Sequence, residues 1–240
     1  MGLDVYVGSL TRYHLGDWLT IVQQMGAHNG MTVRIMRDTP QEPPAPGVVL
    51  DAVSAWRASL AEGLECPVDW AERPDLPYWT DKPDWDGFGA VVLAAAYEVE
   101  PDLRPWTANE IGWSQQEPDD PRQWAAAPAV VAAATHPEPY VTLLSGVEWW
   151  LPLPGGWVIE APRPLGAPVR MAAVEQLVAE LELLAGRLGL TGQAHWQEVG
   201  RAGPPEAGAP VEDVARFGLS VLLPLAYQAH EARQPLLLDY

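Results

Sequence analysis

Alternating and helical patterns at the start of the chain predict a strand, a helix and a second strand. Residues 3–10 alternate between apolar and polar positions, as a half-buried strand does. Asp17 can cap a helix, since apolar residues follow it at helical spacing (Trp18, Ile21, Val22 and Met25). Residues 31–36 alternate again, which predicts a second strand.

Longer apolar runs predict the main helices. The run from Phe88 to Tyr97 is almost continuously apolar and indicates a buried helix, although periodicity alone does not exclude a buried strand. Pro224 is expected to kink or split the last helix, because its ring clashes with the carbonyl of Ser220. The other predicted helices cover residues 48–64, 125–135 and 169–188, and the last one opens at Pro210.

Further strands are predicted in the second half of the chain. Residues 140–144 have the composition of a strand. The runs 147–153 and 157–161 flank a Pro-Gly-Gly turn and predict a hairpin. Residues 236–238 predict a short buried strand.

These elements predict an α+β fold in a single domain over residues 1–240. We expect a mixed β-sheet with helices packed mainly on one face, joined by long loops rich in proline and tryptophan. Residues 38–47 and 200–210 concentrate proline and glycine and are expected to be exposed loops or linkers.

Charge and composition narrow the class of partner. The chain carries 14 basic and 32 acidic residues, a net charge of −18. This charge disfavours nucleic acid and anionic membranes as partners and favours a basic protein or a cation. The charge could equally serve solubility alone. Cys66 is the single cysteine, which excludes an intramolecular disulfide and fits a reducing cytoplasm. No leader pattern is visible, and no apolar run reaches the length of a membrane span.

The stretch from Glu62 to Asp120 concentrates acidic residues and tryptophans. It holds fifteen acidic and three basic residues, so its net charge is −12 (three minus fifteen). Tryptophan anchors dominate binding energy at interfaces, and carboxylates steer a basic partner. At least half of the tryptophans are expected to be core residues instead. The predicted interface residues are Trp70, Trp79, Asp81, Asp84, Trp85, Asp86, Trp106 and Trp113.

Motifs for cofactors and metals are not found. The chain has no phosphate-binding or dinucleotide-binding glycine motif and no nucleophile elbow, so no cofactor is predicted. One cysteine and scattered histidines exclude a Cys/His zinc site. Residues 81–87 resemble a calcium loop, but Lys82 and Leu93 occupy positions that require carboxylates.

An alternative site lies around the first strand. Asp4, Tyr6, His14 and Asp17 could form the site of a small hydrolase or a metal-assisted enzyme. His14 and Asp17 would then be a base and the carboxylate that orients it, or two metal ligands three residues apart. The simpler interpretation makes His14 a surface residue and Asp17 a helix cap.

The segment MGLDVYVGSLTRY, followed by Gly16-Asp17-Trp18, resembles the opening of a group of uncharacterised bacterial proteins that begin MGLDVYVG-x-LTRY. Acidic, tryptophan-rich chains of this style are similar to immunity proteins paired with bacterial toxins. The charge and the tryptophans of residues 62–120, together with this likeness, predict a cytoplasmic protein-binding module, most concretely an immunity-type inhibitor that occludes a basic toxin or enzyme. A structural or regulatory module without chemistry of its own is a third possibility.

Overall fold

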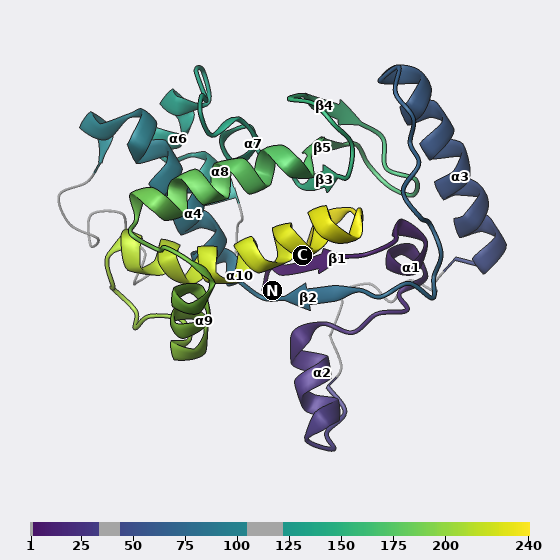
Figure 1. Cartoon of the computed structure of the whole chain (residues 1–240), viewed down its shortest axis with the longest axis horizontal. Helices are drawn as coiled ribbons and strands as arrows, with labels where there is room; N and C mark the ends of the chain where they lie inside the picture. Colours follow the sequence, from purple (N-terminus) through teal and green to yellow (C-terminus); the bar gives the residue numbers. More distant parts are fainter. Residues whose placement is uncertain (1, 34–43, 105–121) are drawn as a thin grey trace.

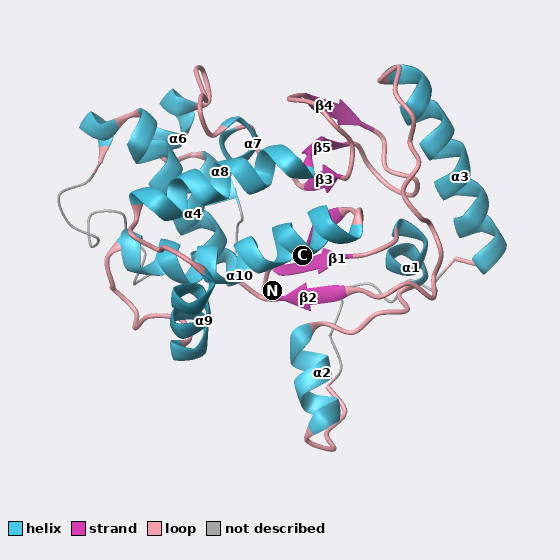
Figure 2. Cartoon of the chain, in the orientation of Figure 1, coloured by secondary structure: helices cyan, strands magenta, loops and turns pink. Residues whose placement is uncertain are grey.

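A mixed β-sheet forms the centre of the computed structural model, which describes residues 2–33, 44–104 and 122–240. Within these residues the sheet has six strands in the order β2-β1-β6-β3-β5-β4. Figures 1 and 2 show helices on both sides of the strands. The strands are β1 (Asp4–Val7), β2 (Trp79–Asp81), β3 (Trp149–Leu151), β4 (Val158–Ala161), β5 (Val169–Ala173) and β6 (Leu236–Asp239).

The helices supply most of the mass around the sheet. The predicted buried helix is confirmed as α4, and the predicted helix at 48–64 is confirmed as α3. The helices are α1 (Leu10–Leu15), α2 (Ile21–His28), α3 (Pro46–Gly63), α4 (Asp84–Val99), α5 (Arg122–Ala125), α6 (Pro128–Ala133), α7 (Val141–Leu144), α8 (Val174–Arg187), α9 (Gln193–Ala202) and α10 (Val211–Ala232), with the 3₁₀ turn η1 (Pro101–Leu103).

The last strand of the chain lies in the middle of the sheet. β6 pairs antiparallel with β1 on one edge and with β3 on the other. Leu236, Leu237 and Leu238 are all buried, because neighbours cover both edges and both faces of the strand. The predicted buried strand at 236–238 is therefore confirmed.

The larger core fills one face of the sheet. Val5 and Leu238 point from the strands into an apolar layer formed mainly by α4, α8 and α10. Helices α4 and α10 touch at two glycines: a Cβ on Gly218 would lie 2.2 Å from the Gly87 carbonyl oxygen. Only glycine allows this approach of the two backbones.

A smaller core covers the opposite face, where apolar residues of α1 and α3 pack with residues of the strands. Its centre is a set of tryptophans in edge contact, with Trp56 at 6.4 Å from Trp70 and 6.2 Å from Trp149 between ring centroids. The indole N–H of Trp56 donates to the Pro162 carbonyl at 2.7 Å. The predicted α+β fold with helices mainly on one face is confirmed, and this second layer is the minor one.

Two strand predictions were wrong in the second half of the chain. Residues 141–144 form helix α7, because the Glu180 carboxylate accepts the backbone N–H groups of Thr142 and Leu143. The runs 147–153 and 157–161 do not pair as a hairpin, since β5 lies between β3 and β4. The real hairpin joins β4 to β5, so residues 169–173 are a strand and helix α8 begins only at Val174.

Other boundaries moved for local reasons. Ser9 caps α1 and Thr20 caps α2 in a capping box with Gln23, so Asp17 is not a helix cap. Pro224 lies inside α10 without splitting it. Residues 31–33 form no strand, and residues 34–36 lie outside the described ranges. Of the loop predicted at 38–47, residues 38–43 lie outside the described ranges and helix α3 already begins at Pro46. Of the loop predicted at 200–210, residues 200–202 belong to α9, and the connection to α10 covers only 203–210.

Across the described parts of the chain, no helix combines the length and apolar character needed to span a bilayer.

We expect Leu237→Ala to lower the free energy of unfolding by about 2–5 kcal/mol, because it opens a cavity in the centre of the sheet. Leu237 is fully buried, whereas Leu183 on α8 is 39% exposed. Leu183→Ala is therefore the control and should change stability by less than about 0.5 kcal/mol. Denaturant unfolding measures both, and equal effects would contradict the central role of β6.

Candidate functional site

Tyr6 lies at the centre of an aromatic cluster beside β1. Its ring centroid is 5.0 Å from that of Trp18, 5.4 Å from that of Tyr13 and 6.1 Å from that of Tyr78. The hydroxyl donates to the Ser9 carbonyl at 3.0 Å. Burial raises the pKa of Tyr6 far above its ordinary value. Tyr6 is thus a fixed core group rather than an accessible acid or base.

The other residues predicted around β1 do not form a catalytic set. Burial, helped by Arg163, lowers the pKa of His14 to about 4, so the imidazole is neutral near pH 7. Burial raises the pKa of Asp4 to about 6. Asp17 is exposed, and no hydrogen bond or ion pair joins it to His14, both of which the structure describes. The proposed base and its orienting carboxylate are not brought together.

The predicted interface residues divide between the core and the surface. Trp70 and Trp85 are only 2% and 8% exposed and belong to the two apolar cores, so they offer no ring face to a partner. Asp84 and Asp86 are exposed, while Asp81 and Trp79 are half-buried. Trp106 and Trp113 lie outside the described residues.

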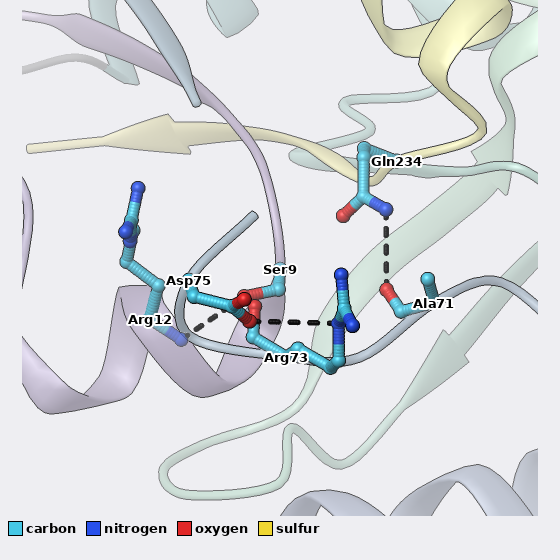
Figure 3. A network of polar contacts seen from close by, with 6 residues as sticks. All are labelled: Ser9, Arg12, Ala71, Arg73, Asp75 and Gln234. Carbon is cyan, nitrogen blue, oxygen red and sulfur yellow. Dashed lines mark hydrogen bonds and ion pairs between the residues drawn. The ribbon is translucent and has the colours of Figure 1, made fainter. Parts of the chain in front are cut away.

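Trp70 belongs to a segment, residues 66–78, whose backbone carbonyls accept hydrogen bonds from side chains elsewhere in the fold. The Ser9 hydroxyl donates to the Arg73 carbonyl at 2.9 Å, and the Gln234 amide donates to the Ala71 carbonyl at 3.1 Å (Figure 3). Arg57 donates to the Trp70 carbonyl and lies 5.0 Å from that indole ring. This part of the acidic stretch is therefore a structural connection.

Glu72 is a half-buried carboxylate that the sequence pattern does not reveal. It accepts the backbone N–H groups of Leu10 and Thr11 at 3.2 and 3.0 Å, at the start of α1. Burial outweighs these bonds and raises the pKa of Glu72 to about 7. Its partners are some sixty residues away in sequence, so no local signal marks it.

A groove runs along α10 and past the edge strand β2. A cavity of about 350 Å³ lies against Trp79, Thr80 and Asp81, and one of about 1240 Å³ lies between α9 and α10. Asp81, Val221, Pro224 and Gln228 line both cavities. The two cavities therefore form one groove, with these residues at their junction.

Helix α9 contributes both aromatic and polar side chains to the groove. Trp196 stacks on Tyr227 of α10, with ring centroids 5.6 Å apart and planes at 16°. Gln197 and Arg201 of α9 lie beside the pair, and Arg201 donates to the Gln197 carbonyl of its own helix. Helix α9 has no fully buried residue, and none of these groove residues was predicted as part of a site. Their sequence pattern is that of ordinary amphipathic helices.

Helix α2 exposes an apolar surface beside this groove. Figure 1 shows α2 projecting away from the rest of the molecule. Gly26 is its only buried residue, and Gln24 and Met25 line the groove. We define the α2 patch by its four exposed apolar side chains: Leu19 (43% exposed), Val22 (43%), Met25 (60%) and Met31 (60%).

Comparison with protein-family models, with curated proteins and with solved structures finds no match for this chain. In the parts of the chain that the structure describes, no three His, Cys, Asp or Glu side chains are grouped to hold a metal ion. The groove and the α2 patch are the features from which a function can be argued.

The raised pKa of Glu72 predicts that stability falls as pH rises. The folded protein binds this proton more tightly than the unfolded chain, so the contribution is complete below about 4.5 and is lost as pH passes about 7. Glutamine does not titrate in this range. We therefore expect Glu72→Gln to lose roughly 1–3 kcal/mol less unfolding free energy than the unmodified protein as pH rises from about 4.5 to about 7. Denaturant unfolding at a series of pH values measures it.

Glu206→Gln is the matched control, because Glu206 is exposed in the loop before α10 and loses the same charge. A pH profile that Glu72→Gln and Glu206→Gln change equally would show that net charge, rather than burial of Glu72, sets the dependence.

Proposed function

We propose that this chain is a cytoplasmic protein-binding module that acts as an immunity-type inhibitor of a basic toxin or enzyme. The α2 patch beside the groove is the observation that supports this proposal. The patch and the groove would form the contact surface, and inhibition would follow from covering the partner's active cleft.

Exposed apolar side chains gathered on a projecting helix are typical of interaction surfaces. Four of the exposed large apolar residues lie within residues 19–31, in and beside the eight-residue helix α2. Methionine adapts its shape to a partner's surface, and Met25 and Met31 are the most exposed of the four. Burial against a partner would remove this apolar area from water.

The charge of the chain supports a basic partner. With a net charge of −18, the protein attracts cationic surfaces and repels nucleic acid. Asp84 and Asp86 are exposed at the start of α4, next to the edge strand that borders the groove. Carboxylates at the rim of an apolar contact accelerate encounter with a basic protein more than they add affinity.

The test is co-expression of the chain with each basic protein encoded beside its gene. We expect one of these proteins to be toxic alone and harmless with the chain. Calorimetry should give one-to-one binding that weakens as salt screens the charges. Neighbouring proteins that are all harmless alone and all fail to bind at low salt would contradict the proposal.

Leu19→Ser combined with Val22→Ser should weaken this binding by about tenfold or more, because it removes apolar anchors from the α2 patch. The matched control is Val131→Ser with Leu183→Ser, which removes an exposed valine and leucine from α6 and α8. Equal affinity for the two double variants would remove the α2 patch from the contact surface.

A further inference from the structure

The floor of the groove contains a backbone acceptor that its own helix does not satisfy. Helix α10 continues from Val211 to Ala232 with Pro224 inside it. Proline has no N–H, so the carbonyl of Ser220, four residues earlier, lacks its helical donor. The Ser220 hydroxyl donates to the Phe217 carbonyl at 2.7 Å. Both Ser220 and Pro224 line the larger cavity, which brings this part of α10 to the groove.

Asp81 brings a second acceptor to the same place. It lines both cavities at their junction, together with Pro224 and Gln228. Its carboxylate accepts the backbone N–H of Lys82 at 2.8 Å, and burial raises its pKa. The described residues form no ion pair with Asp81, because the Lys82 ammonium is paired with Asp84 at 3.2 Å. The carboxylate is therefore partly desolvated without a cation to balance it.

We propose that this junction, with the adjoining wall of the larger cavity, binds an arginine side chain of the basic partner, between Asp81, the Ser220 carbonyl and the Gln228 amide. This inference rests on the proposed function and assigns the chemistry that the groove recognises. A guanidinium group carries five N–H donors in one plane and no acceptor, which suits a site made of acceptors. The Trp79 indole borders the smaller cavity and offers an aromatic wall for such a group.

Other ligand classes fit this junction less well. An anion would meet Asp81, with Glu231 farther along the larger cavity and a strongly negative molecule around both. The cations nearby are already engaged, since Lys82 pairs with Asp84 and Arg201 donates to the Gln197 carbonyl. A neutral amide would leave the carboxylate without a counter-charge.

The first test uses N-acetyl-arginine amide as the probe, followed by amide chemical shifts of the ¹⁵N-labelled protein. We expect saturable shifts, at millimolar concentrations, for Asp81, Val221 and the Gln228 side chain. N-acetyl-citrulline amide has nearly the same shape without the charge and should give none. Asp81→Asn should weaken arginine binding by about tenfold, and Glu206→Gln should leave it unchanged.

The second test is Pro224→Ala, which returns an N–H to α10 and engages the Ser220 carbonyl. Arginine affinity should fall by about threefold or more, while thermal stability rises because alanine favours a helix interior. Opposite signs for binding and stability separate this effect from simple unfolding. Equal binding of the citrulline probe, or unchanged affinity in both Asp81→Asn and Pro224→Ala, would overturn the arginine site.

The two proposals fail in different ways. Leu19→Ser with Val22→Ser lies outside the junction and should leave arginine binding unchanged. A partner that binds normally to Asp81→Asn but not to the α2 double variant would overturn the arginine site and keep the docking proposal. Saturable binding of the arginine probe, with no basic protein found to bind the chain, would keep the arginine site and overturn the proposed inhibitor function.

Discussion

The fold depends on the insertion of its last strand into the middle of the sheet. β6 is the only connection between the β1–β2 pair and the group of β3, β5 and β4 among the described strands. Both apolar cores also draw residues from β6, with Leu236 and Leu238 on one face and Leu237 on the other. The sheet is therefore complete only when residues far apart in the chain have met, which makes its pairing non-local and raises the contact order of the fold.

Distant carboxylates organise two of the short helices. Glu72 binds the backbone N–H groups that begin α1, and Glu180 binds those that begin α7. Helices of four to six residues do not form by themselves, so these bonds decide the local structure. This explains why residues 140–144 were predicted as a strand from their composition. The carboxylate that stabilises their helical conformation belongs to Glu180, almost forty residues away in sequence.

Long amphipathic or apolar segments could be predicted from the sequence, and short ones could not. The apolar residues within the segments of α3, α4 and α10 are enough to indicate helices. Three consecutive leucines, Leu236 to Leu238, are enough to indicate a buried segment. The Pro-Gly-Gly turn at 154–156 resembles a hairpin turn, yet β5 competes successfully for the edge of β3. The candidate site was located only in part, because Asp81 and Trp79 belong to the acidic stretch but Pro224 and Ser220 come from the last helix.

The structure separates the two roles that the acidic stretch could have. Backbone carbonyls of residues 66–78 accept hydrogen bonds from side chains elsewhere in the fold, and Trp70 and Trp85 are buried in its cores. Around β2 the balance differs, since Asp81 has no ion-pair partner among the described residues and Pro224 leaves the Ser220 carbonyl without its helical donor. Asp81, Ser220 and the exposed Met25 all line the same groove. An outside donor can satisfy these two acceptors, which is the physical basis for placing the binding site at this groove.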